Sequence, residues 1–519
     1  MNFNLLLHTI CHLKPIQLVY QVRNRVLKPK FQMHHYLDDW QIPSLKTDPI
    51  PRPKCRKGNI FTFINIASEF TDWNDASRGM LWAYNQNYFD YINDVDSDKA
   101  YGEYWIDKFI REIPNNKVGL DPYPIALRGI NWVKFFSRYL ETLTKERADS
   151  LFSQYKLLKK KLEYHLLGNH LLEDFYSLYI MSIFFNDIKY HRWVTKKLLK
   201  ELKEEILVDG GHYEQSVMYH CILLDRLLDC INFSKDVESN QLNIYASKML
   251  GWLQSMCYDD NTYPLFNDSA YGIAPTPEEI FNYAGRLGLT WSKNELRDSG
   301  YRKLKTTTSK GTTIEVFTHT GNITASYQPG HSHADTFTYE LKINGKPFVV
   351  DTGISTYNKT ARREYERSTY AHNTVCFIGK DKNGKVCLKN SSETWGGFRV
   401  GKRAVVRGDS CTTADNKVHA RQFFIDKEGF EVLDQVEYPA VSLIHLAPDV
   451  KVCSITSSEN NSYLVETNMM SITISGATDV KECDCLISRE YNKLLESKSI
   501  EISFSKEIKY RIHENIIGN

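Results

Sequence analysis

The sequence shows no large excess of either charge and no long apolar run. Its 65 lysines and arginines against 63 aspartates and glutamates leave a formal net charge of +2 over 519 residues. A chain balanced in this way has no overall attraction for nucleic acid or another polyanion, so any such attraction must be local. No stretch approaches the roughly 20 apolar residues that a membrane-spanning helix needs. We therefore expect neither a nucleic-acid partner nor a membrane span.

Paired cysteines and a leader segment are also missing. The 11 cysteines are scattered, only Cys483 and Cys485 lie close together, and no Cys-x-x-Cys pair occurs. This pattern fits neither a zinc ribbon nor a disulfide framework and favours free thiols. The stretch Met1–Tyr20 lacks the basic start, long apolar core and small-residue cleavage site of a signal peptide. We therefore expect a cytoplasmic protein.

What the chain does contain is a change of hydrophobic period near residue 300. Before it, apolar residues follow helical spacing, as in Trp193–Val208 and Tyr139–Leu167, with no strand pattern between them. Thr276 with Pro277 and Glu279 has the form of a helix N-cap. Many helices without strands indicate a bundle, a solenoid or a toroid.

Beyond residue 300 the period drops to two, as in half-buried strands. Runs such as 312–316, 324–326 and 337–341 alternate, and Asn344-Gly345 predicts a tight hairpin between two of them. Many short strands favour an antiparallel β-sandwich. We predict an N-terminal extension over 1–50, a helical domain over 51–300 and a β-sandwich domain over 301–519.

Histidines and acidic residues gather between Gly330 and Asn373. His333, Asp351 and His372 supply two imidazoles and one carboxylate, ligands that suit zinc among other metals. The predicted hairpin helps to bring His333 and Asp351 together, although its register places Asp351 opposite Thr338. The chain before Asp335 must therefore fold back for both to reach one ion.

Three further groups of polar residues lie in the helical half. Asn169 and His170 follow Gly168 at an expected helix junction, and Asp209–His220 contains Glu214 and Tyr219 after two glycines that predict a tight turn. The third group is Arg128, Asn131 and Trp132. Each group also has a purely structural interpretation: a half-buried helix tyrosine for Tyr219, or a helix start for Arg128.

Taken in order, these motifs resemble the heparinase II/III family of polysaccharide lyases, which also includes alginate lyases. The resemblance runs from Leu81–Asp90 through Arg128–Trp132, Gly168–His170, Asp209–His220, His331–Asp335, Asp351–Gly353 and His372–Val375. It implies an incomplete (α/α) toroid followed by an antiparallel β-sandwich, which agrees with the change of period.

The resemblance also implies a chemistry, β-elimination at a uronic acid of an acidic glycan. Asn169 and His170 would neutralise the uronate carboxylate, as donors do in an oxyanion hole. Tyr219 would protonate the leaving oxygen and His331 would act as the opposing base. Tyr370 resembles a further tyrosine of the alginate-cleaving members.

Three more features of the site follow from the resemblance. Arg128, Asn131, Trp132 and Glu214 are expected to bind substrate. His333, Asp351 and His372 are expected to hold a structural divalent metal, zinc or alternatively calcium. Secreted members suggest a periplasmic location as the alternative, and the His12–Gln17 opening is similar to members found beside exopolysaccharide synthesis genes.

Two other functions remain open at this point. A glycoside hydrolase on the same scaffold would need two positioned carboxylates, for which Glu214, Asp209 and Asp335 are candidates. A non-catalytic glycan-binding protein of exopolysaccharide synthesis would keep the scaffold alone. The set of Asn169, Tyr219 and His331 favours elimination over both.

Overall fold

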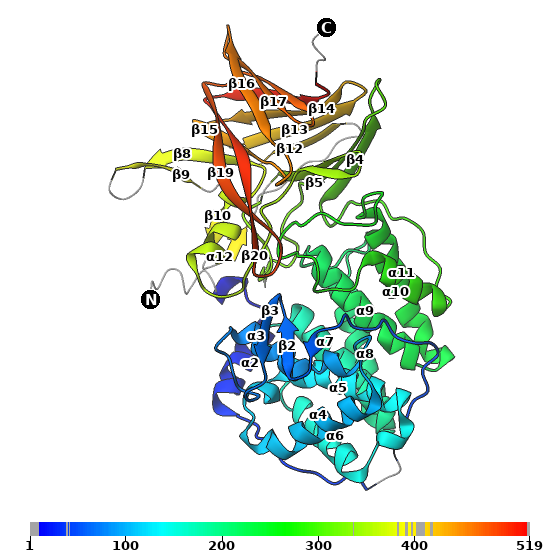
Figure 1. The fold of residues 1–519 in the computed structure, drawn as a ribbon. Helices are drawn as coiled ribbons and strands as arrows, with labels where there is room; N and C mark the ends of the chain where they lie inside the picture. Colours follow the sequence, from blue (N-terminus) through cyan, green and yellow to red (C-terminus); the bar gives the residue numbers. More distant parts are fainter. Residues whose placement is uncertain are drawn as a thin grey trace.

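The computed structural model describes residues 10–37, 40, 42–327, 329–335, 337–380, 384–389, 393–395, 398–400, 411–415 and 419–515. Residues 1–9, which belong to the stretch tested above for a signal peptide, lie outside this description. Figure 1 shows a helical half in the lower part of the view and a β half above it. No helix among the described residues is long and apolar enough to cross a membrane.

Helices make up most of the first 290 residues. They are α2 (Pro15–Val26), α3 (Met80–Tyr88), α4 (Lys99–Glu112), α5 (Pro122–Arg138), α6 (Lys145–Leu158), α7 (Gly168–Phe184), α8 (Ile188–Glu205), α9 (Val217–Phe233), α10 (Asp236–Ser255) and α11 (Pro277–Arg286), with the short α12 (Ala361–Glu366) in the β half. The amphipathic pattern around Trp193–Val208 becomes α8, which buries Val194, Leu198 and Leu202. The predicted cap at Thr276 is a full capping box with Glu279.

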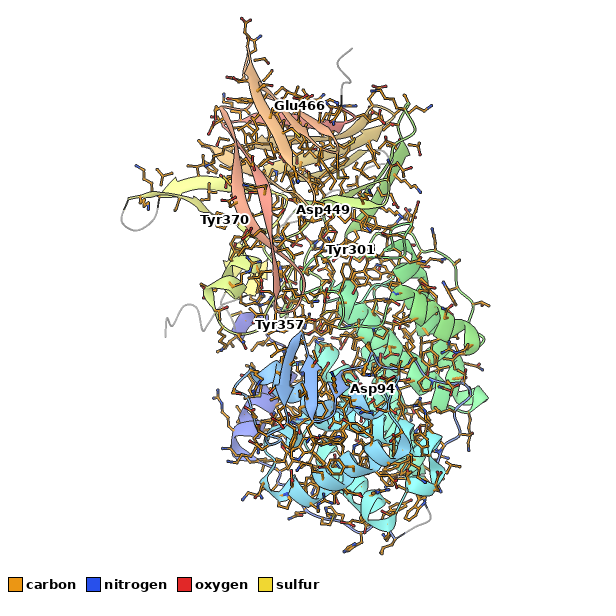
Figure 2. All side chains as sticks on the ribbon, in the orientation of Figure 1. Asp94, Tyr301, Tyr357, Tyr370, Asp449 and Glu466 are labelled. Atoms are coloured by element: carbon orange, nitrogen blue, oxygen red, sulfur yellow. The ribbon has the colours of Figure 1, made fainter. Side chains whose placement is uncertain are left out.

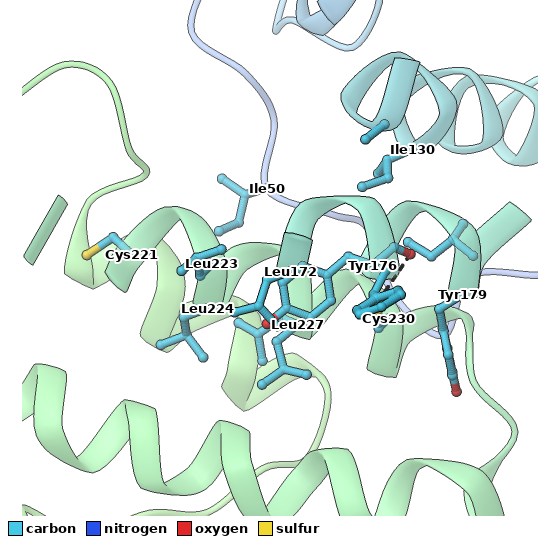
Figure 3. Packing of buried hydrophobic residues seen from close by; sticks show 14 of the residues in the cluster. Ile50, Ile130, Leu172, Tyr176, Tyr179, Cys221, Leu223, Leu224, Leu227 and Cys230 are labelled. Carbon is cyan, nitrogen blue, oxygen red and sulfur yellow. Dashed lines mark hydrogen bonds between the residues drawn. The ribbon is translucent and has the colours of Figure 1, made fainter. Parts of the chain in front are cut away.

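The centre of the helical half is α7, which packs against α5, α8 and α9. Its side chains, most of them apolar, are buried on almost every face, so it can lie only where other elements surround it. Figure 3 shows Leu172 and Tyr176 of α7 packed among Leu223, Leu224 and Leu227 of α9. Burying each such leucine contributes about 1.5–3 kcal/mol. This packing fixes the ends of α7 and α9, where the candidate site lies.

Two details of the helical half differ from the prediction. The expected helix over Tyr139–Leu167 is interrupted, with α6 ending at Leu158 and an irregular segment from Lys159 to Leu167. A small antiparallel sheet also stands before the first toroid helices, made of β1 (Arg56–Lys57), β2 (Ile60–Phe63) and β3 (Ile66–Glu69). Its strands are too short for a recognisable alternation, because only Phe61 and Phe63 face the core.

The β half consists of antiparallel sheets. Its strands are β4 (Tyr301–Thr307), β5 (Thr313–His319), β6 (Thr338–Ile343), β7 (Lys346–Val349), β8 (Val375–Lys380), β9 (Val386–Lys389), β10 (Glu393–Trp395), β11 (Phe398–Val400), β12 (Cys411–Asp415), β13 (His419–Asp426), β14 (Gly429–Val436), β15 (Ala440–His445), β16 (Val452–Ser458), β17 (Ser462–Thr467), β18 (Ser471–Ser475), β19 (Asp479–Glu490), β20 (Lys493–Phe504) and β21 (Glu507–His513). The principal sheets have the orders β12-β13-β14-β21-β18-β17-β16, β19-β20-β15-β8-β9 and β4-β5-β6-β7.

One apolar core lies between these sheets and includes Val432, Ile472 and Ile500. The predicted hairpin at Asn344-Gly345 joins β6 to β7, with positive φ angles of 47° and 75°. The expected strand over 324–326 is instead a loop. A helical toroid followed by an antiparallel β-sandwich, the predicted fold, is confirmed. The ten cysteines whose side chains are described are free, as predicted.

Two hairpin turns connect the halves beside the candidate site. The β2–β3 turn contains Ile64 and Asn65, and the β19–β20 turn contains Tyr491 and Asn492. Asn65 Nδ2 donates to the Tyr491 carbonyl at 2.9 Å, and Asn492 Nδ2 donates to the Ile64 carbonyl at 2.7 Å. The long β19–β20 hairpin therefore reaches from the sandwich onto the helical half, as Figure 1 also shows.

Candidate active site

The first helical turn of α7 presents Asn169. Its Nδ2 donates to Glu214 Oε2 at 3.1 Å and contacts His331 Nε2 at 3.1 Å. Gly168 allows this approach, because a Cβ at that position would meet Glu214 Oε1 at 2.2 Å. The residue before α7, Leu167, has a φ of +62°, so the chain turns sharply into the helix. Asn169 is thereby fixed between a carboxylate and an imidazole.

His331 comes from the β half and completes this contact across the junction. Its Nδ1 lies 2.9 Å from Asp268 Oδ2. Since a carboxylate only accepts, the ring proton belongs on Nδ1, and Nε2 is left as the acceptor for the Asn169 amide. A histidine whose Nε2 lone pair is directed at a hydrogen-bond donor has the form required of a general base.

Tyr219 lies over the ring of His331, with the two ring centroids 3.9 Å apart. It occupies the first turn of α9, which Ser216 caps by accepting from the Tyr219 backbone N–H. Its hydroxyl is 3.0 Å from the hydroxyl of Tyr357, and that of Tyr357 is 3.4 Å from His331 Nδ1. Burial raises the pKa of Tyr219 above its usual value. Tyr219 therefore keeps its proton at neutral pH, as a general acid must.

Asp268 links the histidines of the β half to the helical half. It also accepts from His333 Nε2 at 2.8 Å and from both terminal nitrogens of Arg363 at 2.7 Å. Burial opposes ionisation of Asp268, but Arg363 and the two histidines outweigh it and hold its pKa well below the usual range. A permanent negative charge therefore orients His331.

His170 lies beside this network and is bound to another acid. Its Nδ1 is 3.1 Å from Glu163 Oε2, and its ring packs 4.8 Å from that of Tyr123. Burial alone would lower the pKa of His170, but Glu163, with further acids including Glu214, raises it. A histidine that is more easily protonated adds positive charge next to Asn169.

Comparison with known proteins identifies the relatives of this architecture. The N-terminal domain of the heparinase II/III family matches residues 132–284, and the heparinase II/III-like C-terminal domain matches residues 289–513. The chain belongs to the heparinase II/III family. The predicted resemblance is thereby confirmed, and both matched domains contribute residues to the network.

Curated relatives share low sequence identity. The heparin-sulfate lyase of Bacteroides thetaiotaomicron is 24% identical over 434 residues, which are 70% of this chain and 59% of that protein. The heparin-sulfate lyase of Pedobacter heparinus is 24% identical over 303 residues, 52% of this chain and 44% of that protein. The matched region thus spans about half the length of these relatives.

Solved structures agree in fold. The structure of heparinase III has a TM-score of 0.59 with 16% identity, covering 84% of this chain and 77% of that one. The structure of heparan sulfate lyase from Pedobacter heparinus has a TM-score of 0.52 with 16% identity, covering 96% and 88%.

Contrary to the prediction, Tyr370 of this heparinase II/III fold does not lie in the network. Its hydroxyl donates to the Leu388 carbonyl, and its ring packs beside Cys376, Val441 and Leu443. A 3-10 turn over Thr369–Ala371 directs it toward the sandwich. Figure 2 shows Tyr370 in the β half and Tyr357 at the junction of the halves. Tyr357, which sequence reasoning missed, stands beside Tyr219 instead.

The prediction that Arg128, Asn131 and Trp132 of α5 bind substrate is also wrong, because these side chains are engaged inside the fold. Arg128 is fully buried, and its guanidinium donates to Gln154, to the Asn87 carbonyl and to the Gly119 carbonyl. Asn131 donates to the Tyr88 carbonyl, and Trp132 is buried in the helical core. These side chains hold helices together and do not reach the site.

Asp268 and Arg363 were also missed as a pair. Asp268 stands in an irregular segment after α10, next to Asn267 with its φ of +57°. A polar triplet in a loop, Asn267-Asp268-Ser269, is the one local signal that could have drawn attention to it.

The three expected metal ligands lie near one another in the β half. His372 Nδ1 is 2.7 Å from Asp351 Oδ2, and the rings of His333 and His372 are 5.3 Å apart. His333 Nδ1 is buried and has no hydrogen-bond partner among the residues that the structure describes, which leaves one nitrogen available as a ligand. Within the described part of the chain, however, no three such side chains converge closely enough to hold an ion. The donor chemistry fits a metal, and the present geometry does not.

Proposed function

We propose that this protein is a polysaccharide lyase that cleaves an acidic, uronic-acid-containing glycan by β-elimination. The observation that carries the proposal is the placement of His331, with Nδ1 on the buried Asp268 and Nε2 on the Asn169 amide. The protonated Tyr219 lies against the same ring. A base and an acid thus stand side by side, as abstraction and expulsion on one sugar require.

Asn169 supports recognition of the uronate carboxylate. One hydrogen of its Nδ2 is held by Glu214, and the other contacts His331 Nε2. A carboxylate entering the site takes this second hydrogen, since an anionic acceptor binds it more strongly than an imidazole does. Substrate binding then frees the lone pair of His331 at the moment when the base is needed.

The elimination follows from these positions. His331 Nε2 takes the proton from C5, and the C–H electron pair forms the C4–C5 double bond as the bond from C4 to the glycosidic oxygen breaks. The Tyr219 hydroxyl gives its proton to that oxygen. Negative charge that develops on the carboxylate is offset by the Asn169 amide, with His170 beside it. The products are a fragment with a 4,5-unsaturated uronate at its new non-reducing end and a fragment whose expelled oxygen becomes the hydroxyl of a new reducing end.

The relatives favour a glycosaminoglycan of the heparan sulfate class as substrate, because both are named heparin-sulfate lyases. Alginate stays a second candidate. A divalent metal, zinc or calcium, held by His333, Asp351 and His372 also stays a prediction; its place would be structural, and no step of the elimination uses it.

A hydrolase receives less support from the carboxylates. Asp209 accepts from the Ser299 backbone N–H at 2.8 Å, and Asp335 pairs with His319 at 2.8 Å. Glu214 is engaged by Asn169. Each carboxylate considered therefore already has a partner within the structure, whereas hydrolysis needs a pair of carboxyl groups that act on the substrate.

The decisive experiment incubates the purified protein with heparan sulfate, hyaluronan, alginate and bacterial exopolysaccharides and follows the ultraviolet absorbance of the new double bond. Tyr219→Phe removes the general acid, so we expect kcat to fall by about 10²–10⁴-fold. Tyr104→Phe, on an exposed tyrosine of α4, is the matched control and should leave kcat unchanged.

New reducing ends without absorbance would instead identify a hydrolase. Binding without any cleavage would indicate the non-catalytic glycan-binding protein.

A further inference from the structure

A cavity of about 570 Å³ lies outside the network just described. Its walls come from α2, α8 and the irregular segment Lys159–Leu167 between α6 and α7. We name it the α2–α8 cavity. Its volume is in the range of pockets that hold one small ligand or a few sugar units.

The α2–α8 cavity carries an excess of positive charge. Lys14 pairs with Glu204, and Lys159 pairs with Asp187 at 3.0 Å. Lys197 and Lys200, one turn apart on α8, also line the cavity. Neither forms an ion pair within the described residues.

Glu201 lines the same cavity on α8. The lining side chains therefore carry four ammonium groups, those of Lys14, Lys159, Lys197 and Lys200, and two carboxylates, those of Glu201 and Glu204. This excess of positive charge favours an anionic ligand.

Aromatic side chains provide a second, independent feature. Trp193 is 38% exposed and lines the cavity, with Lys197 Nζ 5.6 Å from its ring centroid. The Tyr190 ring packs 5.0 Å from Trp193. The Tyr190 hydroxyl is buried and has no hydrogen-bond partner among the described residues. Leaving a buried hydroxyl without a partner is unfavourable, and this favours a polar ligand beside Tyr190.

The α2–α8 cavity and the candidate active site share walls. Leu162 and Leu167 line the cavity. Between them lies Glu163, which holds His170, and directly after them come Gly168 and Asn169.

A second wall is shared through Tyr327. Its hydroxyl donates to Glu204 of the cavity at 2.6 Å, and its ring lies 5.8 Å from that of Tyr213, the neighbour of Glu214. The cavity therefore lies directly behind the segments that carry Asn169 and Glu214.

We propose that the α2–α8 cavity is an outlying subsite for the same acidic glycan, taking an anionic sugar unit away from the bond that is cut. Lys197 and Lys200 bind its carboxylate or sulfate groups, and Trp193 packs on its ring. Tyr190 donates its free hydroxyl hydrogen to the bound sugar. This inference rests on the proposed substrate class but not on the elimination step.

The test measures binding, so that it stands apart from catalysis. Fluorescently labelled hexasaccharides of heparan sulfate, hyaluronan and alginate are titrated into the full chain carrying Tyr219→Phe, and fluorescence anisotropy reports Kd. Adding Lys197→Ala with Lys200→Ala should weaken the tightest of these complexes about tenfold. Lys196→Ala with Lys203→Ala, on exposed lysines of the same helix that do not line the cavity, should leave Kd unchanged.

Trp193→Ala separates a sugar subsite from a simple anion site, and thermal unfolding checks that each variant folds. The proposal requires that Trp193→Ala also weaken the hexasaccharide complex. Equal Kd values for the two lysine pairs would overturn it, as would no binding of any of the three hexasaccharides. An effect of the cavity lysines without an effect of Trp193 would reject the sugar assignment. If the hexasaccharides bind through the cavity but no double bond forms, the lyase proposal is rejected and the subsite proposal stands.

Discussion

At the scale of single residues, the site depends on Gly168 having no side chain. Its φ is +59°, and an added Cβ would lie 2.2 Å from Glu214 Oε1. We expect Gly168→Ala to displace Glu214, and with it the Asn169 amide that the carboxylate holds. A misplacement of about 1 Å at a reacting group lowers catalysis by about 10²-fold, which is the loss of kcat/KM expected here.

A matched control separates this displacement from the backbone effect. Gly288 has a φ of +76° with nothing within 4 Å of an added Cβ. Gly288→Ala should therefore lose about 1 kcal/mol of unfolding free energy, from the left-handed conformation alone, and keep full activity. If Gly168→Ala were as active as Gly288→Ala, the position of Glu214 would not control Asn169.

Residue roles were predictable only where the motif and the backbone agreed. Asn169 and Tyr219 stand in the first turns of α7 and α9, which packing fixes, whereas Asp268 holds His331 in the loop between β5 and β6. Tyr370 and Tyr357 are both tyrosines in irregular segments, and no periodic pattern tells which one turns toward the helical half. Arg128 shows the reverse error. The sequence alone does not distinguish a buried arginine that donates to carbonyl groups from one that binds substrate.

At the scale of elements, periodicity gave reliable predictions for long segments. The lysine-rich pattern of α8 and the capping box of α11 are both present. Short elements such as β2 were not predictable, since four residues hold too little alternation to stand out. The convergence of Asp268 with Arg363 joins residues 95 positions apart, and no local pattern encodes such a contact.

The interface of α7 with α9 contains an acid whose ionisation should be visible in stability. Glu173 on α7 is fully buried, with Arg226 of α9 at 3.7 Å. Burial raises the pKa of Glu173 to about 7, more than Arg226 lowers it. The pKa of Glu173 in the unfolded chain is about 4.3. Between that value and pH 7, the unfolded chain has lost the carboxyl proton while the folded chain still holds it. Glu173 therefore lowers the unfolding free energy progressively as the pH rises through that window.

Glu173→Gln removes this dependence. The unfolding free energy of the variant minus that of the wild type should increase from pH 5 to pH 8, by up to about 3 kcal/mol. Urea denaturation at several pH values measures the difference. Glu295→Gln, on an exposed acid of the loop after α11, is the control and should give a flat difference. A difference for Glu173→Gln that fell with pH would contradict the raised pKa.

At the scale of the whole molecule, the candidate site exists only where the two halves meet. Asn169 and Tyr219 come from the helical half, whereas His331 and Tyr357 come from the β half. The β2–β3 and β19–β20 turns hold this junction, and Tyr491 of the second turn packs 5.6 Å from the Tyr357 ring. Loosening the turns should therefore move the base away from the acid without unfolding either half.

Replacing Asn65 and Asn492 together by glycine tests this expectation. Both have positive φ angles, which glycine adopts freely, so the change removes the two side-chain amides without straining the turns. Each lost hydrogen bond contributes about 1 kcal/mol, so the loss of two lets kcat/KM fall by up to about 30-fold with little change in the thermal midpoint. Hydrogen exchange should rise around Tyr357. Asn461→Gly, at a φ of +57° in the β16–β17 turn, lacks a contact between the halves in the described structure and should behave as wild type. Unchanged activity in the double variant would mean that other contacts between the halves, such as the Asp268–Arg363 pair, are enough to hold the site together.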